Sequence, residues 1–141
     1  MGFSTSAAMG IFGIACFTII GIAVGDVLPV LSDTYASLRD MKDRSVEQMQ
    51  TDITILGVTT SANSSNYDHN VSIQNTGSTT LETQWFTVLI NGVSVSFTSS
   101  STYLVPEQTS TIYVYNLAGS GPTQVKITTE NGISDDYSYI I

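Results

Sequence analysis

The sequence contains very few basic side chains. Only 4 Lys and Arg residues stand against 12 Asp and Glu residues, which gives a net charge of −8 at pH 7. In the range 51–141, seven acidic residues are opposed by Lys126 alone. A surface this poor in cations cannot neutralise phosphates. We therefore expect no nucleic acid among the partners and no binding to anionic lipid headgroups.

Histidine and cysteine occur once each, as His69 and Cys16. One chain therefore cannot form an intrachain disulfide, a zinc site or a histidine-dependent catalytic triad. No glycine-rich phosphate loop is followed by Lys and Ser or Thr. We predict that the protein is not an enzyme and has no catalytic residue, no metal site and no cofactor. The pair Asp68-His69 is expected on a loop surface, and Asp135-Asp136 in a solvated turn rather than at a calcium ion.

No charged side chain precedes Asp26. The run from Ala7 to Val24 is almost wholly apolar, and a helix of about 20 residues crosses a hydrocarbon core of about 30 Å. A single helix also satisfies its own backbone polar groups in lipid. We interpret 1–25 as a transmembrane helix or a helix buried in an assembly. Its contact residues are predicted to be Ala7, Ile11, Ile14, Phe17, Ile20 and Val24.

Three other interpretations of this stretch are weaker. A cleavable secretory signal requires a basic region, yet no Lys or Arg precedes Arg39. Met1-Gly2 also opens a formal myristoylation motif, but one acyl chain beside a whole apolar helix would be redundant. The third alternative is a helix buried in a soluble core. The retained anchor is preferred.

Apolar residues continue at helical spacing after the first charge. The intervals of four and three residues from Val24 onward are typical of a helix packed on another helix. Pro29 lies within this run and is expected to kink the helix. We predict an amphipathic helical extension over 26–50 that enters the next domain without a flexible linker. Its packing seam is predicted to consist of Leu28, Leu31, Tyr35 and Leu38.

From Thr51 the hydrophobic period changes from about 3.6 to 2, and β-branched residues become frequent. Asn91-Gly92 between two such runs is the strongest hairpin signal, and Asn131-Gly132 predicts a second hairpin. About seven short strands over 51–141 are typical of an immunoglobulin-like antiparallel β-sandwich. The predicted fold class is α+β, with a long N-terminal hydrophobic helix followed by this sandwich. The predicted strands are 52–60, 70–75, 84–90, 93–98, 109–116, 123–129 and 136–141.

The surface of the predicted sandwich is rich in Ser, Thr and Asn. Two sequons make Asn63 and Asn70 possible N-glycosylation sites. The three basic residues within 39–44 follow the span and favour a cytoplasmic location, but acids outnumber them. We give more weight to the hydroxyl-rich surface and place the domain outside the cytoplasm.

Aromatic residues in the strands leave a sugar-binding module open as a further alternative. A platform for a sugar would consist of Trp85, Tyr103, Tyr113 and Tyr115. Alternating aromatic residues in strands more often fill the core or form cross-strand pairs.

The uncharged helix, the amphipathic extension and the small sandwich together resemble the type IV pilin-like proteins of archaea. The opening Met1-Gly2-Phe3-Ser4-Thr5-Ser6 and the segment from Asp40 to Ile53 resemble the archaellum (archaeal flagellum) accessory protein F family. The run from Val71 to Leu81, with the later Val105-Pro106-Glu107, is similar to accessory proteins F and G.

This resemblance implies a stator component anchored in the cytoplasmic membrane by a single span. Its β-domain would lie in the extracellular or pseudoperiplasmic space, bind the surface layer and hold the motor while the filament turns. The implied partners are the surface-layer protein, G-type accessory proteins and the membrane motor complex. Open sheet edges further predict a homo-oligomer.

The rival interpretation is a filament subunit, either an archaellin or an adhesive pilin. Prepilin peptidase cuts after a basic residue that precedes Gly or Ala, and nothing basic precedes Gly2. Many pilins also carry an acidic residue near the mature N-terminus, and Phe3 to Val24 contains none. Both departures favour the accessory protein, provided that Met1 is the true start. If the numbering begins after processing, a filament subunit stays open, because the same helix would pack in a filament core.

Overall fold

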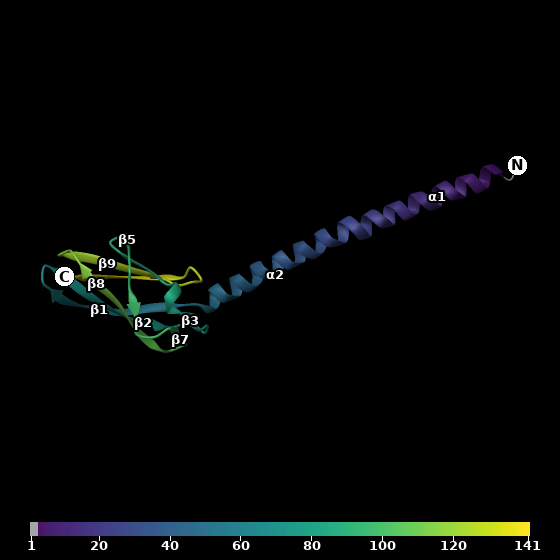
Figure 1. Cartoon of the computed structure of the whole chain (residues 1–141). Helices are drawn as coiled ribbons and strands as arrows, with labels where there is room; N and C mark the ends of the chain where they lie inside the picture. The colour runs from purple at the N-terminus through teal and green to yellow at the C-terminus, as the bar shows by residue number, and fades with distance from the viewer. Residues whose placement is uncertain (1–2) are drawn as a thin grey trace. The chain divides into compact units, whose positions relative to one another are not determined.

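The computed structural model describes residues 3–141. Met1 and Gly2, which open the N-terminal motif discussed above, lie outside the described residues. The chain divides into two compact units, Met1–Asp43 and Arg44–Ile141. The first is helical, and the second contains the last residues of the helical segment and all the strands of the described chain (Figure 1).

The helical segment begins with α1 (Phe3–Ile22), passes through a π-helical turn, η1 (Ala23–Val27), and continues as α2 (Leu28–Gln50). It contains a window of mean hydropathy 2.3 and is long and apolar enough to cross a membrane. None of that window is buried within the single chain. In water this apolar surface would be unfavourable, so lipid or other protein chains must cover it.

The π-helical turn η1 lies just before Pro29, where a kink was predicted. Proline has no N–H to donate to the carbonyl of Gly25, and its ring crowds that oxygen. The helix widens by one residue here, so that the Leu28 N–H bonds the carbonyl oxygen of Ala23, five residues earlier. The helical run thus accommodates Pro29 by a local change in hydrogen-bond pattern.

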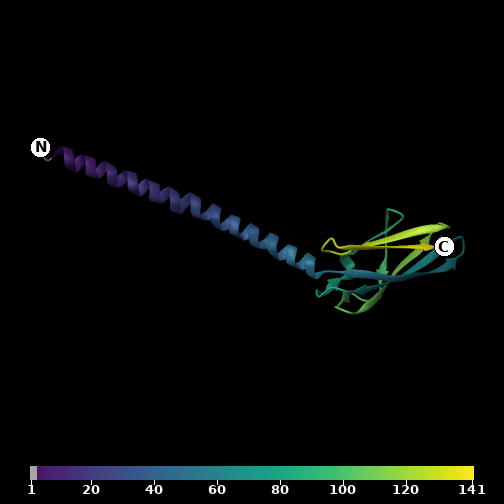
Figure 2. The same ribbon diagram turned by 180° about the vertical axis from the view of Figure 1, so that it is seen from behind.

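The second unit contains two four-stranded antiparallel sheets in the described part of the chain (Figure 1, Figure 2). The first sheet has the order β1 (Ile53–Asn63), β2 (Asn66–Asn75), β8 (Thr109–Leu117) and β6 (Thr98–Ser99). The second has the order β10 (Ser134–Ile140), β9 (Pro122–Thr128), β4 (Thr87–Ile90) and β5 (Val93–Val95). A small ladder pairs β3 (Leu81–Glu82) with β7 (Tyr103–Leu104), and a 3-10 turn, η2 (Thr83–Trp85), follows β3.

The structure confirms the predicted α+β fold, an apolar N-terminal helix followed by an antiparallel β-sandwich. Asn91 and Gly92 both have positive φ, 49° and 80°, as the predicted hairpin between β4 and β5 requires. The predicted strand 84–90 begins as η2 instead, and the predicted strand 93–98 is divided between two sheets. The two-residue strands β3 and β7 were missed because they are too short to show a period of two.

The hydrophobic core lies between the two large sheets and comes from alternate residues of their strands. Along β2, for example, Val71 and Ile73 are fully buried while their neighbours point outward. The buried hydrophobic residues are Ile53, Ile55, Val71, Ile73, Leu81, Phe86, Val88, Ile90, Leu104, Ile112, Val114, Val125 and Ile127. All of them belong to the sandwich, so this unit has a core of its own.

A loop of the sandwich binds the end of α2 through backbone hydrogen bonds. The Ser78 N–H donates to the carbonyl oxygen of Gln50 at 2.8 Å. The N–H groups of Thr76 and Gly77 donate to the carbonyl oxygen of Asp52 at 3.0 and 3.1 Å. Carbonyl groups at a helix C-terminus have no donor within the helix, and this loop supplies one for Gln50.

A second loop binds the same end of α2 through side chains. The Gln48 amide donates to the backbone carbonyl of Asn131 at 3.0 Å. The Asn131 amide donates to the Thr51 hydroxyl at 2.8 Å, and this hydroxyl donates to the carbonyl of Glu47 at 2.8 Å. Two loops that are far apart in sequence therefore fix residues 47–52 to the sandwich.

Gly77 lies so close to this helix end that adding a methyl group at this position is predicted to destabilise the sandwich. A Cβ at Gly77 would overlap the carbonyl oxygen of Gln50 and lie 2.5 Å from the backbone nitrogen of Asp52. We expect Gly77→Ala to lower the free energy of unfolding by about 1–3 kcal/mol, as overpacking against fixed backbone does. Urea unfolding of the full chain in detergent, followed by Trp85 fluorescence, measures this cost.

Gly57→Ala is the matched control, because a Cβ at Gly57 in β1 meets nothing within 4 Å. This variant should stay within about 0.5 kcal/mol of the unsubstituted protein. Equal stability of the two variants would contradict the assigned contact at Gly77.

Candidate interaction surfaces

The predicted contact residues of the N-terminal helix recur at spacings of three and four along α1 and η1, so they share one half of the helix surface. Ala7, Ile11, Ile14, Phe17 and Ile20 lie on α1, Val24 lies on η1, and all six are exposed in the single chain. A helix that is apolar all round is typical of a span or of a helix surrounded by other protein. The structure does not select one face of this helix for contact.

The predicted seam of α2 forms a continuous stripe. Leu28, Leu31, Tyr35 and Leu38 are between 47% and 71% exposed. Residues at spacings of three and four lie on one face of a helix, so a second helix could pack along them. That packing stays a prediction.

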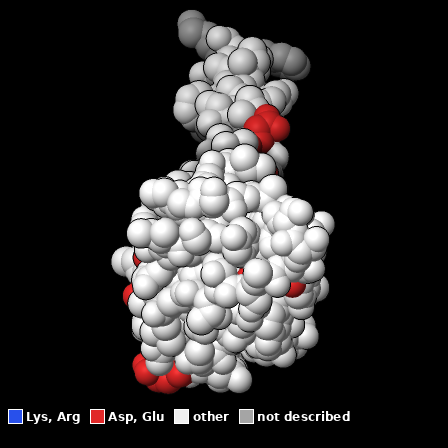
Figure 3. Space-filling model, turned by 90° about the vertical axis from the view of Figure 1, so that its left-hand side faces the viewer, with Lys and Arg blue, Asp and Glu red and all other residues white. Residues whose placement is uncertain are grey.

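The surface of the sandwich carries mainly neutral polar groups. The face turned to the viewer in Figure 3 shows no Lys or Arg and only scattered acidic side chains. On β2 the outward residues Asn70, Ser72 and Gln74 are amides or hydroxyls. A partner of this face would be recognised by shape and hydrogen bonds rather than by opposite charge.

The two sequons occupy different environments. Asn63 is exposed at the end of β1, next to the turn at Ser64, and its amide donates to the Asp68 carboxylate at 3.1 Å. Asn70 is partly buried in β2, between Thr59 of β1 and Tyr113 of β8. Only Asn63 therefore has the exposed turn position at which a modifying enzyme can reach a folded domain. Glycosylation stays a prediction at both.

The four aromatic residues considered for a sugar platform do not form one cluster in the structure. Tyr113 and Tyr115 of β8 are stacked, with ring centroids 6.3 Å apart and planes 7° apart. Trp85 lies on η2, where its indole N–H donates to the Glu82 carboxylate at 3.1 Å. Tyr103 lies on β7, and no ring contact links it or Trp85 to the tyrosine pair among the described residues.

The prediction that His69 lies on a loop surface was wrong. His69 is only 1% exposed and belongs to β2, which begins at Asn66, four residues before the predicted start. Its Nδ1 lies 2.7 Å from the Tyr139 hydroxyl of β10, and the two rings meet edge to face. The longer strand places His69 on the inward face together with Val71 and Ile73, and the pair joins the two sheets.

Burial dominates the protonation of this pair. It lowers the pKa of His69 from 6.5, against the smaller opposing effect of the nearby Asp68 carboxylate. It raises the pKa of Tyr139 to about 12. The His69 Nε2 is buried without a hydrogen-bond partner. A neutral imidazole is therefore favoured, and the pair acts as a polar contact within the core.

The expectation for Asp135 was also wrong. Asp135 lies in β10 rather than in a turn, and its carboxylate accepts the Ile55 N–H of β1 at 2.7 Å. The register of β1 shifts between Ile55 and Gly57, so this N–H is available to a side chain. Within residues 3–141 no group of three or more His, Cys, Asp or Glu side chains is placed to hold a metal ion.

The lowered pKa of His69 predicts that the sandwich loses stability in mild acid. Near pH 6.5 and below, the unfolded chain binds a proton at His69 more readily than the folded chain does. The free energy of unfolding therefore decreases as the pH is lowered. We expect a measurable decline between about pH 7 and pH 5.5, a window above the titration of ordinary carboxylates. Urea unfolding at a series of pH values measures this decline.

His69→Leu should abolish most of the slope in this window, because the chain has no other histidine. Tyr139→Phe should keep the slope, since the imidazole stays buried. An unchanged slope in His69→Leu would contradict the assignment.

Comparison with known proteins gives a relative and several similar structures. No family model matches the chain. A protein of Archaeoglobus fulgidus, described as uncharacterized, is 31% identical over 134 residues, which cover 95% of this chain and 70% of that protein. The periplasmic archaellum stator protein FlaG from Sulfolobus acidocaldarius is 25% identical over 63% of this chain and 99% of its own, with a TM-score of 0.55.

Two further structures show the same fold at lower identity. A chain in the stator complex of FlaF and FlaG from Sulfolobus acidocaldarius matches 62% of this chain and 87% of its own at 24% identity, with a TM-score of 0.54. A chain of the archaeal flagellum of Methanospirillum hungatei strain JF1 matches 96% of this chain and 92% of its own, with 14% identity and a TM-score of 0.75.

These likenesses confirm the resemblance to archaellum proteins. The likeness to FlaG also supports an archaellum-associated role. The Archaeoglobus fulgidus protein is similar enough to this chain, over most of both sequences, to show that the two share a family. The chain belongs to the same family as this archaeal protein, and it has the fold of archaellum components.

Proposed function

We propose that this protein is a stator component of an archaellum and has no enzymatic activity. The observation that carries the proposal is the likeness to FlaG, because identity of 25% extends over nearly all of that solved stator chain. In this proposal the apolar helix anchors the protein in the cytoplasmic membrane, and the sandwich lies on the outer side. There it binds the surface-layer protein, together with G-type accessory proteins and the motor complex.

A stator must transmit load between its anchor and its binding domain. The connection between α2 and the sandwich suits this task, because Ser78 and Asn131, from two separate loops, bind the helix end directly or through Thr51. The α-helix runs without interruption from Leu28 to Gln50, and strand β1 begins at Ile53. Only two residues separate these elements, which leaves no room for a flexible linker.

The many uncharged polar groups of the outer surface support binding to a large envelope partner through hydrogen bonds. Amide and hydroxyl groups both donate and accept, so a face of this kind is compatible with another protein of similar composition. Its single basic residue, Lys126, is outnumbered by acids, which argues against the membrane surface itself as the bound partner. The two longer open edges, β1 and β10, are also suited to self-association.

A filament subunit is the second candidate, and a specific observation favours it. The flagellum chain of Methanospirillum hungatei shares the fold over 96% of this chain, helix included. The FlaG likeness covers only 63% of this chain, a share that matches the length of the sandwich. The exposed apolar helix would be covered by lipid in a stator and by neighbouring helices in a filament.

Mass spectrometry of the native protein separates the two functions. We expect the protein at full length in the membrane fraction and absent from sheared filaments, because a stator stays anchored. The sandwich should also capture surface-layer protein from an envelope extract. Abundant protein in purified filaments, with its N-terminus trimmed, would overturn the stator proposal in favour of a filament subunit.

The seam of α2 gives a test of helix-mediated association. Leu31→Glu places a charge in the seam, and we expect it to weaken cross-linked oligomers by about tenfold or more, as loss of a buried Leu would. Ser37→Glu, on the opposite face of α2, is the control and should leave the oligomers unchanged. Cross-linking in native membranes, read by gel, measures both. If Leu31→Glu forms the same oligomers, the seam does not pack on a partner.

A further inference from the structure

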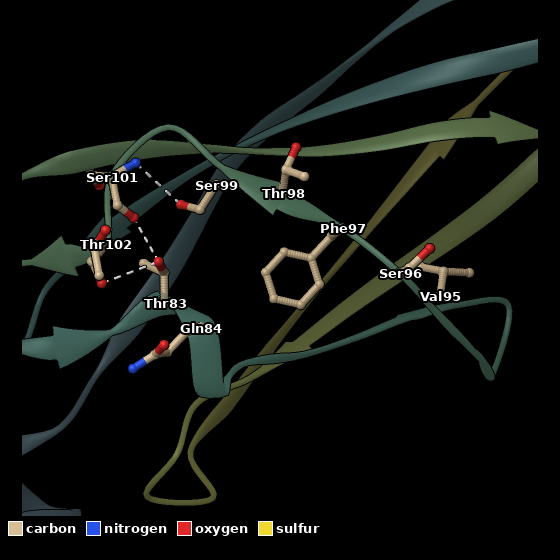
Figure 4. A pocket seen from close by; sticks show the side chains of 9 residues that line it. All are labelled: Thr83, Gln84, Val95, Ser96, Phe97, Thr98, Ser99, Ser101 and Thr102. Carbon is tan, nitrogen blue, oxygen red and sulfur yellow. Dashed lines mark hydrogen bonds between the residues drawn. The ribbon is translucent and has the colours of Figure 1, made fainter.

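A hollow of about 550 Å³ opens between η2 and the segment that leads from β5 to β6 (Figure 4). This volume is within the range of about 300–1,000 Å³ that is common for small-molecule sites. Six of the nine lining residues carry hydroxyl groups, and the others are Gln84, Val95 and Phe97. The chain passes from one sheet to the other here, and this crossing leaves the hollow open.

No ionisable side chain lines the hollow, although the range 51–141 contains seven acids. Lys126, the one basic residue of this range, is not among the lining residues either. An anionic ligand would find no cation here and would be repelled by the net negative domain. A cation would find no carboxylate in the lining. The electrostatics of the hollow therefore fit a neutral, polar ligand.

An aromatic ring lies among these polar groups. The Phe97 side chain points into the space between η2 and the crossing segment, with Val95 farther along the same segment (Figure 4). Phe97 is partly buried and packs against the core, which fixes its position. An apolar ring among hydroxyls matches a sugar, whose C–H groups pack on an aromatic face while its hydroxyls bind polar groups.

The polar groups of the hollow are held in position and keep hydrogen-bonding capacity. Thr83 is only 2% exposed, and its hydroxyl donates to the carbonyl oxygen of Ser101 at 2.6 Å, which fixes this side of the hollow (Figure 4). The Gln84 amide nitrogen donates to the Glu82 carboxylate at 2.7 Å, so its carbonyl oxygen can accept from a ligand. Ser96 and Phe97 belong to no strand, and the structure records no backbone hydrogen bond for either.

We propose that this hollow is a binding site for a neutral carbohydrate, such as a hexose unit of a glycan. An extended peptide fits less well, because strand addition requires a regular edge. The adjoining strands β5 and β6 have only three and two residues, and the crossing segment between them is irregular. The inference concerns the sandwich alone and holds for a stator or a filament subunit alike.

Saturation-transfer NMR on the full chain in lipid nanodiscs tests this site without glycoside detergents, which would compete. The probes are neutral gluco-, galacto- and manno-oligosaccharides, with oligouronates of equal length as the anionic comparison. We expect saturable binding of at least one neutral oligosaccharide and none of the oligouronates.

Two variants in the hollow locate the site. Phe97→Leu keeps an apolar side chain but removes the ring, and Gln84→Ala removes an acceptor. Each should weaken binding by about threefold to tenfold, which is the loss expected for one contact of this kind. Trp85→Phe and Thr59→Val, at exposed residues outside the lining, are the matched controls and should bind as the unsubstituted chain does.

Several results would overturn the proposal. They are the absence of saturable binding to any neutral probe, equal binding of the oligouronates, and full binding by both hollow variants. Loss of binding in Trp85→Phe would place a sugar site on the exposed indole instead. Saturable binding of an extended neutral peptide, together with no binding of any sugar probe, would show that the hollow takes a strand. A chemical-shift comparison of each variant with the unsubstituted chain confirms that the sandwich is folded.

Discussion

The apolar surface of the N-terminal helix is the constraint on which the rest of this structure depends. From Phe12 to Leu31 its large side chains are about half or more exposed in the single chain. At about 25 cal/mol per Å² of apolar area, such a surface cannot remain in water. Lipid satisfies this constraint in a stator, and neighbouring helices satisfy it in a filament. The helix therefore requires lipid or other protein chains around it, and which of the two surrounds it depends on other parts of the molecule.

The sandwich already has a core of its own, and in addition it must hold the end of a long helix. The bonds to Gln50 and Asp52 come from backbone groups, so they depend on the close approach of the loop at Gly77 more than on side-chain identity. Asn131 adds a second attachment from a distant hairpin. Such a joint suits a protein that carries load, and it serves a filament subunit equally well.

The distribution of charge decides which partners the sandwich can bind. On the face in Figure 3 its acids are scattered and no Lys or Arg is visible, and none of the acids lines the hollow beside Phe97. Partners of such surfaces are selected by shape, aromatic contact and hydrogen bonds. The proposed contact with an envelope protein and the proposed carbohydrate site both follow from this scarcity of charged groups, although they rest on different residues.

The sequence by itself determined the helix, the change of period at Thr51 and the turn at Asn91-Gly92, because each depends on residues close together in the chain. It also excluded a one-chain zinc site or histidine-dependent triad, since His69 is the only histidine. Only the tertiary structure decided that His69 meets Tyr139, 70 residues away, and that Gly77 lies against the end of α2. The hollow likewise exists because the chain changes sheets at Ser96 and Phe97. These contacts depend on how the two sheets pack, and local patterns of hydrophobicity carry no information about that packing.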